Sequence, residues 1–140
     1  MKKNLMPKMV DVNLLDKEGS MVPVSVKLIQ HNQREYLFLS DKGSSPESSI
    51  ARNTAAFIAQ LVERFQLDTT TVSFFRHIYT PESGSVFGHF SIDWKAGKPV
   101  SYTFKVLSNY EQVQKIQTIL LEGTAVALSY SQLKNIAVSA

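Results

Sequence analysis

The hydrophobic residues of this chain change their spacing in a regular order, and this order limits the fold more than any other feature of the sequence. In the first third of the chain they alternate with polar residues in three segments, at Val10 to Leu14, Val22 to Leu28 and Tyr36 to Leu39. Alternation with a period of two between polar turns predicts strands. From Ile50 to Phe65 the apolar residues fall on one helical stripe, which predicts a helix.

The second half of the chain repeats this order. Alternation returns at Val72 to Tyr79, Val86 to Trp94 and Val100 to Val106, and a helical pattern follows between Ser108 and Gly123. We therefore predict an α+β fold of two antiparallel three-stranded meanders, each followed by a helix (βββαβββα), with the helices packed on one face of the sheet.

The ends of the second helix have local signals. Ser108 and Glu111 form an S-x-x-E capping box, and Gly123 is a natural C-terminal stop. Residues 124–140 are predicted to add a short strand and a last turn of helix.

Length and charge indicate one domain with a basic tail. A chain of 140 residues can bury roughly two thirds of the surface that its unfolded form exposes. We predict a flexible tail over residues 1–9 and a single α+β domain over residues 10–140. The net charge is +3, and Lys2, Lys3 and Lys8 in the tail supply much of it. The rest of the chain lacks the clustered basic surface of a nucleic-acid-binding protein.

The residue types that are missing exclude several kinds of chemistry. The absence of cysteine excludes disulfides, thiolate metal sites and cysteine nucleophiles, and it fits a reducing compartment. Pro7 and Lys8 interrupt the basic start before an apolar signal region could form. No apolar run approaches the ~20 residues of a membrane span. We expect a soluble cytoplasmic protein that does not enter a membrane and needs no cofactor.

Residues 73–94 hold two of the three histidines, the only tryptophan and a dense run of aromatic residues. Side chains two apart in a strand share a face, and the apolar pattern places the even-numbered residues toward the core. The opposite, outward face carries the candidate partner-binding residues, which are Phe75, His77, Tyr79, Phe87, His89 and Asp93. On this register His77 and His89 lie opposite or diagonal to each other. A shift by one residue would send His77 to the core instead.

Metal binding and catalysis are not favoured on this face. Two imidazoles and one carboxylate are too few for a closed zinc site, and Asp93 lies about 13 Å along the strand from His89. Ser91 cannot complete a triad with them, because strand neighbours two apart are about 7 Å apart and a nucleophile needs its base at ~3 Å. We predict no metal and no catalytic residue. A small enzyme that uses His77 or His89 is an alternative.

Nucleic-acid binding is the other alternative. The stretch "VFGHF" (residues 86–90) is similar to the aromatic-glycine-aromatic core of the RNA-recognition strand motif. Phe87 and Phe90 are three residues apart, so they point to opposite faces and cannot form one stacking platform. We therefore predict a protein-binding module whose partner is another protein or a second copy of the chain, with single-stranded nucleic acid as the alternative ligand.

Residues 61–117 carry a family resemblance in the stretches "LVERFQLDTTTVSFFRHIYTP" and "FSIDWKAGKPVSYTFKVLSNYEQVQKI". They resemble a group of small uncharacterised bacterial proteins carried on plasmids and other mobile elements. The matching positions are Arg64, Phe65, Leu67, Asp68, His77, Tyr79, Pro81, Phe90, Trp94, Gly97, Pro99, Leu107, Ser108, Glu111 and Val113. Ile78 and Thr80 depart from the group's pattern. The resemblance implies an accessory protein of a mobile element with no assigned activity, and it transfers no catalytic residue.

Overall fold

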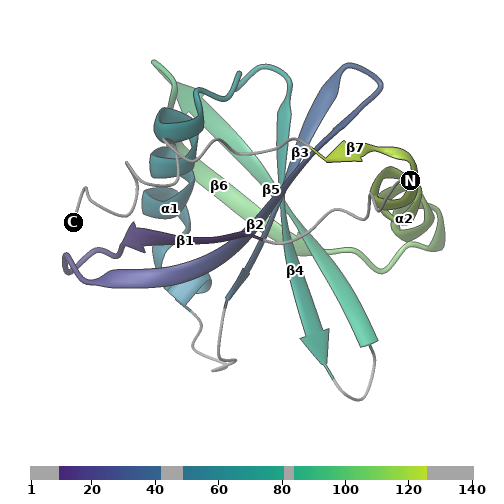
Figure 1. The fold of residues 1–140 in the computed structure, drawn as a ribbon, viewed down its shortest axis with the longest axis horizontal. Coiled ribbons are helices and arrows are strands. Elements are labelled where there is room, and N and C mark those ends of the chain that lie inside the picture. The colour runs from purple at the N-terminus through teal and green to yellow at the C-terminus, as the bar shows by residue number, and fades with distance from the viewer. Residues whose placement is uncertain (1–9, 42–48, 81–83, 126–140) are drawn as a thin grey trace, which may run out of the picture.

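The computed structural model describes residues 10–41, 49–80 and 84–125. In chain order its elements are β1 (Val10–Leu15), β2 (Met21–His31), β3 (Arg34–Asp41), α1 (Ser49–Phe65), β4 (Val72–Thr80), β5 (Gly84–Lys95), β6 (Lys98–Val106), α2 (Tyr110–Glu122) and β7 (Thr124–Ala125). Six strands lie side by side in the order β1-β2-β3-β4-β5-β6 (Figure 1). The predicted mixture of one sheet and two helices is confirmed.

The strand arrangement differs in detail from the predicted βββαβββα order. β3 and β4, the strands joined through α1, are direct neighbours and run parallel, so the two meanders merge into one sheet. This follows from the connection, because a helix that crosses a sheet returns the chain in its original direction. A seventh strand, the two-residue β7, pairs with Ile29 and Gln30 of β2.

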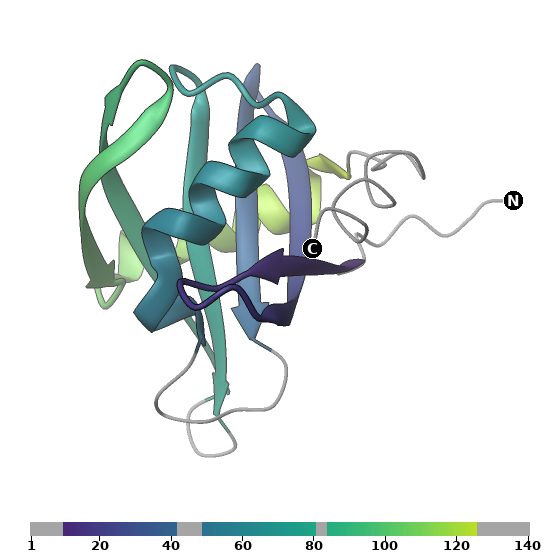
Figure 2. The same ribbon diagram turned by 90° about the vertical axis from the view of Figure 1, so that its left-hand side faces the viewer.

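The prediction that both helices pack on one face of the sheet is wrong. α1 covers one face and α2 the other (Figure 2). The central strands require this arrangement because they bury consecutive apolar residues, and consecutive residues of a strand point to opposite faces. Leu28 and Ile29 of β2 are both buried, and so are Leu37, Phe38 and Leu39 of β3. A single helical layer over the α1 face would leave Ile29 and Phe38 in water.

The larger core lies between α1 and the sheet, and it confirms the predicted helical stripe. Its buried residues on α1 are Ile50, Phe57, Ile58, Leu61 and Phe65. Thr54 lies on the same stripe, and its hydroxyl donates a hydrogen bond to the Ile50 carbonyl oxygen at 2.6 Å. That bond satisfies the polar atom inside the apolar layer.

The second core is smaller and lies under α2. Ile116 and Ile119 of this helix pack against the sheet residues Ile29, Phe38, Phe75 and Phe87. The rings of Phe38 and Phe75 stack with centroids 5.4 Å apart. Most of the face under α2 is therefore aromatic, whereas the core under α1 is mostly aliphatic.

The caps of α2 agree with the predictions at one end only. The N-cap is Asn109 instead of Ser108, and its Oδ1 accepts hydrogen bonds from the N–H groups of Glu111 (2.8 Å) and Gln112 (3.2 Å). Asparagine caps a helix as well as serine does, so the shift of the N-cap by one residue does not lower the stability of the helix. Gly123 ends the helix as predicted, and its N–H donates to the Ile119 carbonyl oxygen at 2.8 Å.

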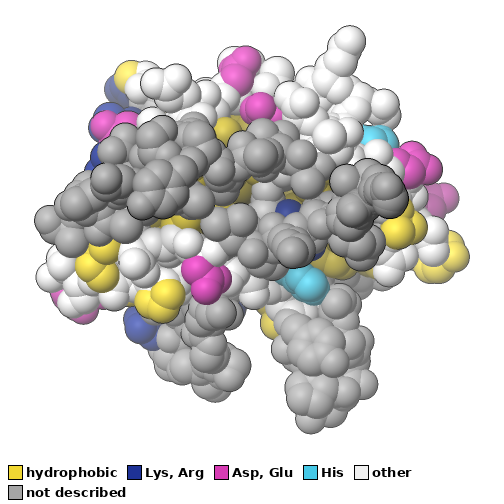
Figure 3. Space-filling view, in the orientation of Figure 1, with side chains coloured by type: hydrophobic (Ala, Val, Ile, Leu, Met, Phe, Trp, Pro, Cys, Tyr) yellow, Lys and Arg dark blue, Asp and Glu magenta, His cyan; other side chains and the backbone are white. Residues whose placement is uncertain are grey.

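Two predictions concern residues outside the described part of the chain. These are the flexible tail over residues 1–9 and the last helical turn beyond β7, which fall among the residues coloured grey in Figure 3. None of the helices that the structure describes is long and apolar enough to cross a membrane.

Candidate functional site

The hairpin of β4 and β5 has the register that the alternation favoured. Phe75 faces His89, and His77 faces Phe87, so the two histidines are diagonal to each other. The ring centroids are 4.8 Å apart in both pairs, and the His77 and Phe87 rings are stacked. These four side chains therefore share one face of the sheet, as predicted.

This face is not an open surface, and that part of the prediction is wrong. α2 lies over it, and only 6% of Phe75 and 4% of Phe87 are exposed. The alternating pattern could assign side chains to faces, but it could not tell which element returns to cover each face. His77 and His89 are half-buried at the border of the covered region.

The other two predicted residues are Asp93 and Tyr79. Asp93 is exposed near the turn between β5 and β6, where its Oδ2 accepts a hydrogen bond from the Ser101 hydroxyl at 2.7 Å. Tyr79 faces Ser85 in the β4–β5 register, and its side chain is outside the described part of the structure. Asp93 therefore does not belong to the group formed by Phe75, His77, Phe87 and His89.

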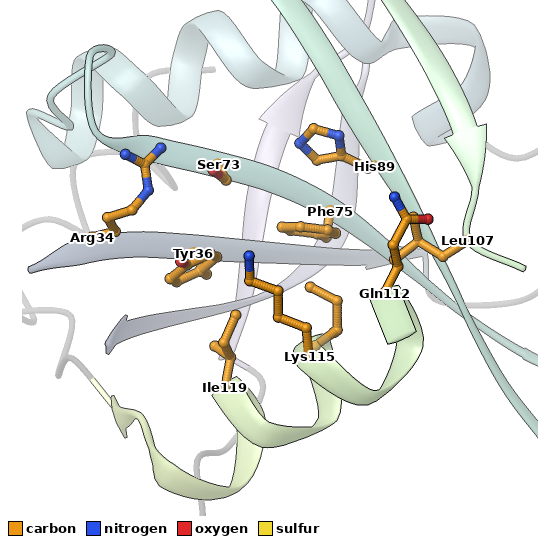
Figure 4. Close-up of a pocket in the computed structure, with 10 residues that line it drawn as sticks. Arg34, Tyr36, Ser73, Phe75, His89, Leu107, Gln112, Lys115 and Ile119 are labelled. Carbon is orange, nitrogen blue, oxygen red and sulfur yellow. The ribbon is translucent and has the colours of Figure 1, made fainter. Parts of the chain in front are cut away.

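Phe75 and His89 instead line a pocket of about 340 Å³ between α2 and the sheet (Figure 4). The apolar residues that line this pocket are Phe75, Leu107, Ile116 and Ile119. Its polar wall is formed by Arg34, Tyr36, Ser73, His89, Gln112 and Lys115. The lining comes from β3, β4, β5, α2 and the residue that follows β6, so the pocket exists only in the folded chain.

The course of α2 across the strands creates this pocket. Leu107 follows β6 and fixes the approach to the helix, because its N–H donates to the Phe87 carbonyl oxygen at 2.8 Å. Phe38 is then covered by the helix, while Tyr36, two residues earlier on the same face of β3, is only partly buried. The uncovered strip beside the helix becomes the pocket.

The mouth of the pocket is cationic. Arg34 projects from β3, and the Lys115 amine points from α2 toward the sheet, between Tyr36 and Phe75 (Figure 4). Both cations are exposed, and neither forms an ion pair within the described ranges of the chain. No Asp or Glu of the described residues lines the pocket. Among the residues that the structure describes, no acidic side chain neutralises the charge of the mouth.

The two histidines of the hairpin favour their neutral form. Burial lowers the pKa of His89 below its usual 6.5. Burial also lowers the pKa of His77, and the nearby charge of Lys27 lowers it further. At neutral pH, His89 thus provides the pocket wall with a polar, uncharged ring that can donate one hydrogen bond and accept another.

Sequence reasoning missed most of the polar wall. Arg34 and Tyr36 are two residues apart on β3, whereas Gln112 and Lys115 belong to the polar side of α2. Nothing in either segment indicates that they meet, since they are brought together by the crossing of a helix over a sheet. The charge of Lys115 on an amphipathic helix was the one available signal, and it also fits an ordinary solvated face.

Within the described residues, no three His, Cys, Asp or Glu side chains are grouped closely enough to hold a metal ion. Comparison with known proteins found no matching family model, no matching curated protein and no matching solved structure.

Proposed function

We propose that this chain is a protein-binding module without catalysis of its own, and that the pocket beside α2 receives a large apolar side chain and a neighbouring carboxylate of the partner. One observation carries the proposal: an apolar floor lies under a mouth that has two cations and no acidic residue among the described residues. Such a pocket attracts a group that combines an apolar body with a negative charge.

The size of the pocket supports one anchor residue. A volume of about 340 Å³ is near the lower end of the range for ligand sites, which is about 300–1,000 Å³. One aromatic or leucine-like side chain would lie on Phe75 and Ile119 and gain about 1.5–3 kcal/mol from burial. A single anchor of this kind is typical of a hot spot in a protein interface.

The cations would provide orientation and specificity. Arg34 has a planar guanidinium that can hold a carboxylate with two parallel hydrogen bonds, whereas Lys115 provides a mobile point charge. Both are exposed and can therefore act on a partner before contact, which raises the association rate.

Binding is favoured over catalysis because of the surroundings of His89. A histidine that acts with a serine nucleophile needs a carboxylate or similar group to orient its ring. Among the described residues, the His89 ring contacts the Phe75 ring, and no carboxylate accepts a hydrogen bond from the His89 imidazole. Ser73, although it lines the same pocket, belongs to a different strand and forms no hydrogen bond with His89 in the described part.

The proposal can be tested by titrating isotope-labelled protein with the capped dipeptide acetyl-Phe-Asp-amide and recording amide and side-chain NMR shifts. We expect saturable shifts at Phe75, His89 and Ile119. The neutral analogue acetyl-Phe-Asn-amide should bind about tenfold more weakly, which corresponds to the loss of one charge-assisted hydrogen bond. Absence of saturable shifts at the pocket with either peptide would contradict the proposal.

Matched charge variants test whether the preference for the charged peptide comes from the cations at the pocket mouth. Arg34→Gln with Lys115→Gln should abolish the preference for the charged peptide, whereas Lys95→Gln with Lys98→Gln removes two charges elsewhere and should preserve it. The free carboxylate 3-phenylpropionate distinguishes the source of the ligand. If it binds as tightly as the dipeptide, the site takes a small aromatic acid and not a protein segment.

The predicted connection with bacterial mobile elements rests on the sequence resemblance alone, and we retain it as a proposal about the origin of the partner.

A further inference from the structure

One edge of the sheet exposes a large apolar strand. β6 is the last strand in the sheet order, and no described strand pairs with its outer edge. Its exposed apolar residues are Val100 (61% exposed), Tyr102 (39%), Phe104 (37%) and Val106 (47%). A contiguous exposed patch of this kind is typical of an association surface.

The opposite edge of the sheet is different in character. The outward side chains of β1 include Asp11 and Asn13, while Val12 and Leu14 are buried under α1. None of the described side chains of β1 is a large exposed hydrophobic residue. Charged and amide side chains at an edge discourage pairing with another strand, and the central part of β6 has no comparable protection on its apolar face.

The backbone of β6 is also oriented for pairing. Leu107 N–H donates to the Phe87 carbonyl oxygen, one step beyond the register pair Gly88 and Val106. Leu107 and Phe87 are thus a hydrogen-bonded pair. Hydrogen-bonded and non-hydrogen-bonded pairs alternate along an antiparallel ladder, so the odd-numbered residues of β6 form the backbone hydrogen bonds to β5. The even-numbered residues Tyr102 and Phe104 therefore direct their N–H and C=O groups toward the open edge.

We propose that two copies of this chain associate edge to edge through antiparallel pairing of β6, with Phe104 on the two-fold axis. In this register Phe104 faces its own copy and Tyr102 faces Val106. These facing pairs exchange two hydrogen bonds each, because their backbone groups are the ones that point outward. The result is one continuous sheet through both copies, with the aromatic side chains of both strands on the same face.

The partner at the β6 edge is a second copy of the chain, because β6 is complementary to its own antiparallel copy. Tyr102 and Val106 lie symmetrically about Phe104, so the two-fold operation places apolar side chains against apolar side chains. On the other face Thr103 is opposite Lys105, and no two lysines are directly opposite each other. The lysines nearest the axis are diagonal to each other, about 7–8 Å apart, where repulsion in water is weak.

The irregular start of β6 sets the register. The pairing with β5 shifts between Asp93 and Trp94, so that Ser101 and Pro99 pair with consecutive residues and Val100 is bulged. A bulge and a proline both interrupt an outer ladder. Centring the new pairing on Phe104 uses only the regular stretch from Tyr102 to Val106.

The absence of cysteine from the sequence allows a direct test. Thr103→Cys and Lys105→Cys are prepared as two separate proteins, both at exposed polar positions of β6. Facing residues of a non-hydrogen-bonded pair have Cα atoms about 4.5 Å apart, which suits a disulfide. We expect mild oxidation to link the two variants when they are mixed. Neither variant should form a disulfide-linked dimer alone, since position 103 faces position 105 of the other copy and two identical positions are not opposite each other.

Sedimentation equilibrium provides an independent readout on the wild-type chain, which we expect to dimerise. Tyr102→Lys should weaken the dimer at least tenfold. Leu121→Lys is the matched control, because Leu121 is 81% exposed and lies on α2 instead of β6. It introduces the same charge on an exposed apolar residue and should leave the dimer unchanged. Thermal melting verifies that both variants fold.

Three results would overturn the proposal. They are a monomer for the wild-type chain at 100 µM (about the upper range of routine sedimentation), equal weakening by both lysine variants, and no disulfide in the mixture of cysteine variants. Cross-linking of Thr103→Cys with Ser101→Cys in place of Lys105→Cys would overturn the register on Phe104. The cysteine test does not depend on a soluble Tyr102 variant, since it uses polar positions only.

Discussion

The side-chain amide of Gln60 pairs with both backbone groups of Leu15. Its Oε1 accepts from the Leu15 N–H at 2.9 Å, and its Nε2 donates to the Leu15 carbonyl oxygen at 2.8 Å. Gln60 lies on α1, and Leu15 is the last residue of β1. One side chain thus satisfies a strand end in the manner of a neighbouring strand and fixes β1 against the helix.

Replacing Gln60 with Ala should lower the free energy of unfolding by about 1–3 kcal/mol, because both partly buried backbone groups of Leu15 lose their partner. Urea denaturation measures this effect. Glu63→Ala, at an exposed position of the same helix, is the control and should change stability by less than about 0.5 kcal/mol. Equal effects of the two variants would mean that the pairing contributes nothing.

Gly88 is required by the ring of Phe104. A Cβ atom at position 88 would overlap that side chain, which lies against the backbone of β5 and contacts the Phe90 ring. Gly88→Ala should therefore destabilise the chain by about 1–3 kcal/mol, the usual cost of overpacking. In a double-mutant cycle with Phe104→Ala the cost should largely disappear, because the clash is gone. Additive effects would contradict this explanation.

Phe87→Asp should unfold the chain. Phe87 lies under α2 between Phe38 and His77, and the substitution would place an unpaired charge in an apolar layer, which costs several kcal/mol. Leu121→Asp introduces the same charge on an exposed residue of α2 and should change stability by about 0.5 kcal/mol or less. Circular dichroism and thermal melting of the two variants decide the matter, and a folded Phe87→Asp would show that α2 does not cover the hairpin.

Stability should fall as the pH is lowered through the ordinary titration range of histidine. The pKa values of His77 and His89 are lowered in the folded state, so the unfolded chain binds protons more readily. The full stability is present above pH 6.5, the unfolded pKa, and decreases from there down to the lowered folded pKa values. Urea denaturation at pH 7.5, 6.5 and 5.5, about one unit on either side of 6.5, measures the slope. His77→Gln with His89→Gln should flatten it.

The sequence alone determined most of the secondary structure, because the spacing of apolar residues that distinguishes a strand from a helix is a property of neighbouring residues. The alternation of Val22 to Leu28 and the stripe from Ile50 to Phe65 both predicted elements that the structure contains. The prediction of which side chains of the β4–β5 hairpin share a face was also correct, since side-chain direction in a strand alternates with position. Phe75 and His89 could therefore be chosen as candidates before their surroundings were known.

Tertiary structure decided what covers each face. The sequence places Phe87 and His89 on one side of a hairpin, but only the path of α2 makes the first a core residue and the second a wall of a pocket. Arg34 and Lys115 meet at the mouth of that pocket although they are distant in sequence, and no local pattern encodes their meeting. Hydrophobic burial is non-directional. A strand with two apolar faces therefore requires that both faces be covered, but it does not specify by which element. The connectivity of the chain selects the helix that covers each face.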